Sequence, residues 1–215
     1  KLKTKGERWL LGDTINASIG QGFVLASPLQ LAVMSARLAT GRKISPRMVS
    51  KTDAVPSPIL DEGPLDIDPE HLSLVRNAMY GVVNRRTGTA HKSRVIWDKY
   101  RMAGKTGTAQ VVALNENNRK KNEDRPWRQR DHALFVNYAP VEYPKIAVSV
   151  VVEHGGGGSA VAAPIARDIT LFALMDNVPP LGAYPKEHRR DIEREQIALR
   201  ERLAQLNAAA GIAET

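Results

Sequence analysis

A lysine, two threonines and a glycine occupy four consecutive positions near the middle of this 215-residue chain. They are Lys105, Thr106, Gly107 and Thr108, within the sequence A-G-K-T-G-T-A-Q at residues 103–110. A cation, hydroxyl groups and backbone N–H groups together suit a carboxylate or an oxyanion. Glycine has no Cβ atom, so a substrate backbone could lie close to it. The stretch is therefore a candidate anion-binding site.

The residues that follow this stretch indicate a β-strand. Residues 111–113 are apolar and β-branched or small, and a strand sends alternate side chains to opposite faces. Lys105 and Gly107 are then expected on one face, and Thr106 and Thr108 on the other. At the edge of a sheet, the strand would also offer free backbone N–H groups. The alternative interpretation is a strand that carries a surface lysine.

Helices and strands that could position this stretch are predicted on both sides of it. Ser27 and Gln30 form an S-x-x-Q capping box around Pro28. Apolar residues at helical spacing predict four helices, at about residues 27–41, 68–84, 160–175 and 186–210. Two further strands are predicted at 132–139 and 146–153, joined by a short connection that suits an antiparallel pair. The predicted fold class is therefore α+β, with an antiparallel sheet flanked by helices.

The remaining segments are predicted to be loops. Residues 1–11 are assigned to a loop and 12–14 to a turn, and residues 42–66, with four prolines, to a loop with one short strand. Residues 115–131 are polar and are predicted to form a long hairpin loop. That loop could contact an anionic glycan or a partner protein, or be a mobile surface loop.

The composition is that of an ordinary globular domain. Hydrophobic residues make up 42% of the chain and charged residues 25%, with a net charge of +8. The charged runs mix both signs and no nucleic-acid-binding motif occurs, so no nucleic-acid partner is expected. The chain has no cysteine, which excludes disulfides and thiolate metal sites. No histidine pair has metal-ligand spacing, no metal or cofactor is expected, and no apolar run is judged to approach the roughly 18 residues of a membrane span.

Several motifs, in order, resemble one family. A-G-K-T-G-T-A-Q resembles the K-T-G element of the penicillin-recognising serine enzymes, in the form found in class B penicillin-binding proteins. G-D-T-x-N-x-S-I-G-Q-G at residues 12–22, running into S-P-L-Q-L-A at 27–32, resembles the penicillin-binding protein 2 type. The helix at 68–84 followed by G-T-A at 88–90 fits the same pattern. The resemblance covers about residues 8–175.

The resemblance implies a peptidoglycan D,D-transpeptidase of the penicillin-recognising fold, without a cofactor. A serine would attack the D-Ala–D-Ala bond of a stem peptide, and an amine of a second stem would accept the acyl group. Lys105 would hold positive charge and assist proton transfer, and the Thr108 N–H would be an oxyanion donor. Thr106, Gly107 and Thr108 would contact substrate, with Thr108 the preferred hydroxyl for the terminal carboxylate. β-Lactams would bind at the same site.

The resemblance also implies a location and partners. The family acts on the periplasmic side of the bacterial inner membrane, with a membrane anchor upstream of this segment. Its expected partners are stem peptides that serve as D-Ala-D-Ala donor or amine acceptor, and a glycosyltransferase or other membrane protein of the elongation complex.

Two signature elements of the family do not occur in the 215 residues. No lysine has a serine three positions before it, as S-x-x-K requires, and no S-x-N is present. We therefore expect residues 1–185 to be the C-terminal part of a transpeptidase domain whose nucleophile lies upstream. Residues 186–215 are expected to form an amphipathic C-terminal helix or tail. The chain alone is expected to form no acyl-enzyme.

Two other functions fit parts of the sequence. One is a catalytically dead binding or scaffold protein of the same fold. The other is a nucleotide-binding module, because residues 155–160 fit G-x-G-x-x-A between a predicted strand and a predicted helix. That motif needs a parallel β-α-β unit, and no second strand is predicted after the helix.

Overall fold

An antiparallel sheet with helices on both faces forms the centre of the computed structural model, which describes residues 6–52, 55–58, 60–112 and 122–209. Its strands are β5 (Ala103–Ala109), β6 (His132–Ala139) and β7 (Ile146–Val152), in the order β5-β6-β7. Both neighbouring pairs are antiparallel. The predicted set of three consecutive antiparallel strands and the α+β class are therefore confirmed.

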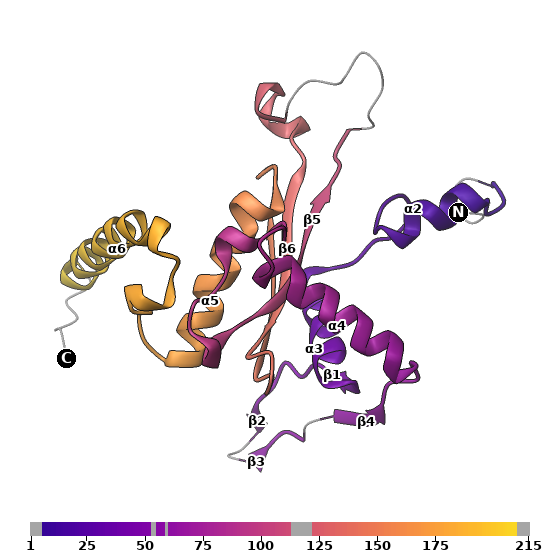
Figure 1. The fold of residues 1–215 in the computed structure, drawn as a ribbon, viewed down its shortest axis with the longest axis horizontal. Helices are drawn as coiled ribbons and strands as arrows, with labels where there is room; N and C mark the ends of the chain where they lie inside the picture. Colours follow the sequence, from indigo (N-terminus) through magenta and orange to yellow (C-terminus); the bar gives the residue numbers. More distant parts are fainter. Residues whose placement is uncertain (1–5, 53–54, 59, 113–121, 210–215) are drawn as a thin grey trace.

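Helices bury the two faces of this sheet (Figure 1). Helix α5 (Ala163–Met175) packs on one face, where its alanines meet Phe135 and Val148 in the larger buried cluster. Helix α3 (Pro28–Thr40) packs on the other face against β6 and β7. Helix α4 (Pro69–Asn84) lies against β5. Strand β5, which carries the candidate residues, is thus paired with β6 along one edge and packed against α4.

The predicted helix caps are present. The Ser27 hydroxyl accepts a hydrogen bond from the Gln30 N–H at 3.2 Å, and the Gln30 side chain accepts one from the Ser27 N–H at 2.8 Å. Gly41 ends α3 in the left-handed region, with φ of 72°. Asp68 caps α4 by accepting a hydrogen bond from the Glu70 N–H at 2.8 Å. These local signals fixed the helix ends because each needs only neighbouring residues.

Two segments predicted as loop or turn contain regular structure. Residues Leu11–Ser18 form helix α2, which buries none of its residues, so Leu11 and Ile15 on one of its faces stay exposed. Its N-terminus is capped by Asp13, which accepts a hydrogen bond from the Leu10 N–H at 2.7 Å. Between α3 and α4 there are two small antiparallel ladders rather than one short strand. Their members are β1 (Arg42–Ser45) with β4 (Leu60–Pro64), and β2 (Lys51–Thr52) with β3 (Val55–Pro56).

By length and composition alone, Gly158–Met175 could cross a membrane, with a mean hydropathy of 1.3. The prediction that no run approaches this length was therefore wrong on composition. In the fold, this segment is a π-turn (Gly158–Ala162) followed by α5. Ala162, Ala166 and Leu171 are fully buried in the larger cluster with β6 and β7. The segment is thus the core helix of this sheet.

The C-terminal segment ends in helix α6 (Arg189–Ala209), at one side of the molecule (Figure 1). The predicted amphipathic helix is present. Near its start, Ile192 is buried in the larger cluster, whereas Leu199, Leu203 and Leu206 are exposed. The predicted domain boundary between residues 185 and 186 stays a prediction.

The predicted hairpin loop lies partly outside the described residues, at 113–121. Its described part contains two short 3-10 turns, Asn122–Asp124 and Trp127–Gln129, before β6 begins.

Candidate active site

The candidate residues lie on β5, and β6 is the one described strand that pairs with it. β5 is thus an edge strand in the part of the chain that the structure describes. Its register on β6 is given by four pairs: Lys105–Val136, Thr106–Phe135, Gly107–Leu134 and Thr108–Ala133. Paired residues share a face, so the predicted alternation of Lys105 and Gly107 against Thr106 and Thr108 is confirmed.

The backbone of Thr108 points toward the open edge. Its carbonyl oxygen accepts a hydrogen bond from the Gln21 side chain, Nε2 to O, at 3.0 Å. In an antiparallel strand the N–H and C=O groups of one residue point to the same side. The Thr108 N–H therefore also points away from β6, which is the direction that an oxyanion donor requires.

Lys105 brings a cation to the same edge. Its side chain is exposed, and its Nζ donates a hydrogen bond to the Thr106 carbonyl at 2.7 Å. Thr106 and Thr108 are two positions apart, so their carbonyl groups point to the same side of the strand. The ammonium group and the Thr108 N–H thus lie on one edge.

The two threonine hydroxyls are in different surroundings. Thr106 Oγ1 lies 3.1 Å from Thr89 Oγ1, where either hydroxyl could be the donor. Thr106 is half-buried, whereas Thr108 is exposed. The hydroxyl of Thr108 is therefore the more accessible one, in line with the preference for Thr108 as the carboxylate-binding residue.

Thr89 lies next to the candidate strand, a placement that the sequence interpretation did not predict, although its G-T-A sequence was noted. A tight turn after α4 presents it, with hydrogen bonds from Gly88 N to Arg85 O at 2.9 Å and from Ala90 N to Val82 O at 3.0 Å. The end of α4 is itself attached to β5, because Asn84 Nδ2 donates to the carbonyl of Met102 at 2.9 Å. Helix α4 thus sets the position of Thr89 relative to Thr106.

The glycine run after β7 packs directly on the K-T-G strand. A Cβ atom added to Gly158 would lie 2.2 Å from the Leu134 carbonyl oxygen and 2.4 Å from that of Gly107. The described strands around it are antiparallel, whereas a dinucleotide fingerprint needs a parallel β-α-β unit. Gly158, in this run, serves close packing on β5 and β6 in this fold.

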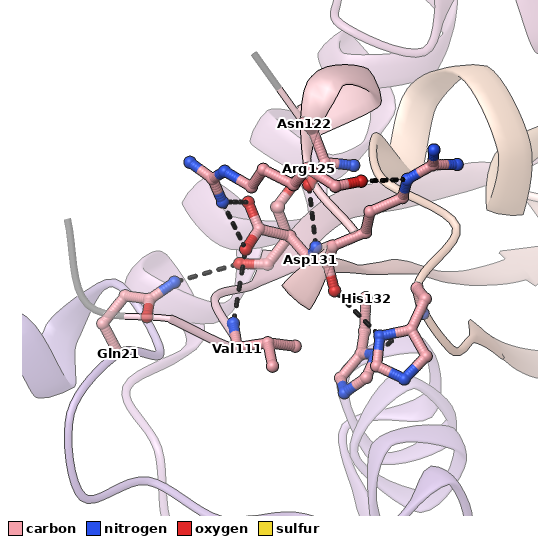
Figure 2. A network of polar contacts seen from close by, with 9 residues as sticks. Gln21, Val111, Asn122, Arg125, Asp131 and His132 are labelled. Carbon is pink, nitrogen blue, oxygen red and sulfur yellow. Dashed lines mark hydrogen bonds and ion pairs between the residues drawn. The ribbon is translucent and has the colours of Figure 1, made fainter. Parts of the chain in front are cut away.

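A polar network fixes the chain just beyond β5 (Figure 2). Asp131 accepts hydrogen bonds from the Val111 N–H at 3.3 Å and from Arg125 Nη1 at 3.4 Å, and its own N–H donates to Asn122 Oδ1 at 2.8 Å. The Arg125 side chain is 6% exposed and that of Asp131 14%. The Asp131 carbonyl also accepts from the Gly156 N–H at 2.8 Å, so this residue joins the strand end, the hairpin and the glycine run.

The histidines next to this network make contacts of their own. His132 Nδ1 accepts a hydrogen bond from the His154 N–H at 2.9 Å, and the two rings lie 4.8 Å apart. Across the described ranges there is no group of three or more His, Cys, Asp or Glu side chains that could hold a metal ion.

Comparison with known proteins gives the family. A family model described as the penicillin binding protein transpeptidase domain matches residues 2–171. The peptidoglycan D,D-transpeptidase MrdA of Haemophilus influenzae is 36% identical over 205 residues, which is 91% of this chain and 31% of that protein. MrdA of Escherichia coli is 35% identical over 189 residues, or 85% of this chain and 30% of that protein. The chain thus spans about a third of the length of these curated relatives.

Solved structures agree with the fold. Pseudomonas aeruginosa PBP2 in complex with WCK 5153 is similar with a TM-score of 0.64 and 36% identity, over 87% of this chain and 37% of that one. PBP2 in its complex with MreC from Helicobacter pylori is similar with a TM-score of 0.64 and 33% identity, over 82% of this chain and 30% of that one. The resemblance to class B penicillin-binding proteins is confirmed, and the chain belongs to the penicillin binding protein transpeptidase family.

Proposed function

We propose that this chain is part of a peptidoglycan D,D-transpeptidase that crosslinks stem peptides through a serine acyl-enzyme. The observation that supports this most directly is the open edge of β5, where the Thr108 carbonyl is held from outside the sheet and Lys105 Nζ reaches the Thr106 carbonyl. A stem peptide could add to that edge as an extra strand.

The proposed chemistry assigns each group a role. A serine oxygen bonds to the carbonyl carbon of the penultimate D-alanine, and the C=O electron pair moves onto the oxygen next to the Thr108 N–H. Collapse of this intermediate breaks the C–N bond, and the terminal D-alanine leaves with a proton on its nitrogen. An amine of a second stem then displaces the serine oxygen, which regains a proton. Lys105 assists the proton transfers, and the Thr108 hydroxyl binds the donor carboxylate.

The other predicted contacts follow from the same pose. Thr106 contributes to the carboxylate-binding region through its pair with Thr89. Gly107 allows the donor backbone to lie close to the strand. β-Lactams would occupy the donor position.

The nucleophile in this proposal comes from outside the 215 residues, because neither S-x-x-K nor S-x-N occurs among them. The whole protein would then be anchored in the bacterial inner membrane and act on its periplasmic side. Its proposed partners are peptidoglycan, a glycosyltransferase of the elongation complex, and a protein of the kind seen with PBP2 of Helicobacter pylori, MreC.

The test is covalent labelling with a fluorescent penicillin, followed by denaturing electrophoresis. We expect no label on the 215-residue chain and a label on a serine of the complete protein. A label on a serine within residues 1–215 would contradict the placement of the nucleophile. A complete protein that binds stem peptides without acylation would instead support the scaffold alternative.

A further inference from the structure

We propose that Gln21 is a positioning residue for the oxyanion-binding end of β5. The inference rests on the proposed function. Its starting point is one long-range contact: Gln21 Nε2 donates to the Thr108 carbonyl at 3.0 Å, between residues that are 87 positions apart in sequence. Figure 2 shows the Gln21 side chain reaching toward this strand from the side opposite to most of the Asp131 network.

The end of α2 presents this side chain in a defined direction. The Gly20 N–H donates to the Ala17 carbonyl at 3.0 Å, and the Gln21 N–H donates to the Asn16 carbonyl at 2.9 Å. These two bonds form a Schellman motif, with Gly20 in the left-handed region at φ of 77°. The second glycine, Gly22, has a φ of 76°. The G-Q-G sequence thus builds a turn that fixes the backbone of Gln21. Its carboxamide is left to reach the Thr108 carbonyl at the end of β5.

The carboxamide acts on the residue whose N–H is the proposed oxyanion donor. Both backbone groups of Thr108 point away from β6, so the strand pairing acts on them only through the neighbours Gly107 and Ala109, whereas the bond from Gln21 holds the Thr108 carbonyl directly. On the other side of the same strand end, Asp131 holds the Val111 N–H at 3.3 Å. A carbonyl oxygen has two lone pairs, so the N–H of a bound stem peptide can use the second one while Gln21 keeps the first.

Loss of this contact should slow acylation without weakening the first binding step. Removal of a complete oxyanion donor typically costs a factor of 10²–10³ in rate. In a Gln21 variant the Thr108 N–H stays in place as donor and only the hydrogen bond that positions its residue is lost. We therefore expect a decrease of roughly tenfold in the acylation rate constant. The dissociation constant of the non-covalent penicillin complex should stay unchanged, because in this proposal Gln21 donates its hydrogen bond to the strand and the ligand keeps the second lone pair of the Thr108 carbonyl.

The experiment uses stopped-flow acylation of the complete protein by a fluorescent penicillin. Gln21→Met keeps the length of the side chain and removes the N–H donor, and Gln21→Glu keeps its shape but offers only acceptors next to a carbonyl oxygen. We expect the acylation rate constant to fall in the order wild type, Gln21→Met, Gln21→Glu, with unchanged melting temperatures. The control is Gln205→Met on the exposed part of α6. A role in packing alone would leave the glutamate variant close to wild type.

A second readout separates this proposal from the proposed function. Amide hydrogen exchange of residues 107–111 should accelerate in both Gln21 variants and not in the control. Equal acylation rates in wild type and variants would overturn the proposal, as would faster acylation, which would mean that Gln21 competes with substrate. An unlabelled wild-type protein would overturn the proposed function, and the exchange rates would still decide whether Gln21 holds the strand.

Discussion

Thr106 and Thr108 carry the same hydroxyl on the same face of one strand, and their neighbours give them different chemistry. Thr106 shares a hydrogen bond with Thr89 at 3.1 Å, whereas Thr108 is exposed beside an open edge. A hydroxyl has one O–H donor, so Thr106 has no proton for a carboxylate when it donates to Thr89, whereas the exposed Thr108 hydroxyl is free to turn toward a ligand. This difference favours the proposed role of Thr108 in binding the donor carboxylate, with a supporting role for Thr106.

Valine substitutions test this assignment, since valine keeps the branched shape and removes the hydroxyl. A hydrogen bond to a charged group is worth about 1.5–3 kcal/mol, so Thr108→Val in the complete protein should lower the second-order acylation rate by roughly 10- to 100-fold. Thr106→Val should act mainly on stability, by about 1 kcal/mol, because it leaves the Thr89 hydroxyl without this partner. Acylation kinetics and urea unfolding measure the two effects. A larger kinetic loss in Thr106→Val would reverse the assignment.

The sequence allowed part of this residue-scale description to be predicted. The residue types and spacing of 105–108 predicted an anion-binding strand, and the family resemblance implied the separate roles of Lys105 and Thr108. Thr89 and Gln21 were not assigned, because their contacts to the strand cross 17 and 87 positions and depend on how α4 and α2 are placed. The signal available for Gln21 was its position between Gly20 and Gly22. Two glycines so close together indicate a tight turn, and a polar side chain within such a turn can contact another segment.

At the scale of elements, the glycine run shows how one helix start packs on the site. Gly158 lies so close to β5 and β6 that an added Cβ atom would overlap two backbone oxygens, of Leu134 and Gly107. A Cβ atom added to the neighbouring Gly157 would have no such atom within 4 Å. Adjacent glycines therefore differ in whether the fold can accept a methyl group.

This difference predicts opposite results for two alanine variants. Gly158→Ala should lower the free energy of unfolding by about 1–3 kcal/mol or more, because backbone atoms cannot move aside as a flexible side chain can. Gly157→Ala should stay within about 0.5 kcal/mol of wild type. Urea denaturation of the two variants checks this. A nucleotide-binding loop would need Gly157 for the close approach of a pyrophosphate, so saturable nucleotide binding that Gly157→Ala abolishes at unchanged stability would support that alternative.

The elements that could be predicted are those with local signals. Helices α3 and α4 have complete caps and apolar stripes, and the alternation along β5 follows from strand geometry alone. Helix α2 was not predicted, and only one short strand was predicted where four lie between α3 and α4, because these elements are short and bury little. Their pairing depends on residues far apart, such as Arg42 opposite Pro64.

At the scale of the whole molecule, Tyr184 joins the C-terminal segment to the helical layer over the sheet. Its side chain is 1% exposed, and the Arg167 guanidinium lies 4.7 Å from its ring centroid. Arg167 is itself paired with Asp168 at 2.8 Å. Burial raises the pKa of the Tyr184 phenol well above its usual value, and the negative charge of Asp168 raises it further, against the opposing charge of Arg167.

This raised pKa predicts a loss of stability at alkaline pH. In the unfolded chain the phenol loses its proton near pH 10, whereas in the folded protein it keeps that proton to higher pH. The contribution of the protonated Tyr184 phenol to the free energy of unfolding is therefore complete below about pH 10. Above that pH it decreases, by at most about 1.4 kcal/mol per pH unit. Tyr184→Phe removes the titrating group, so the free energy of unfolding should fall less steeply between pH 9 and pH 11 in this variant than in wild type.

Other groups, including lysines, also titrate in this range, so the comparison between variants carries the test. Tyr143 offers a matched control, because its side chain is 81% exposed and its hydroxyl is hydrated in both states. Tyr143→Phe should therefore keep the wild-type slope in urea unfolding measured at each pH. Equal slopes for Tyr184→Phe and wild type would mean that the phenol is hydrated in the folded protein. The segment around residue 184 would then be only loosely attached to α5, and α6 would project from a flexible connection instead of a packed one.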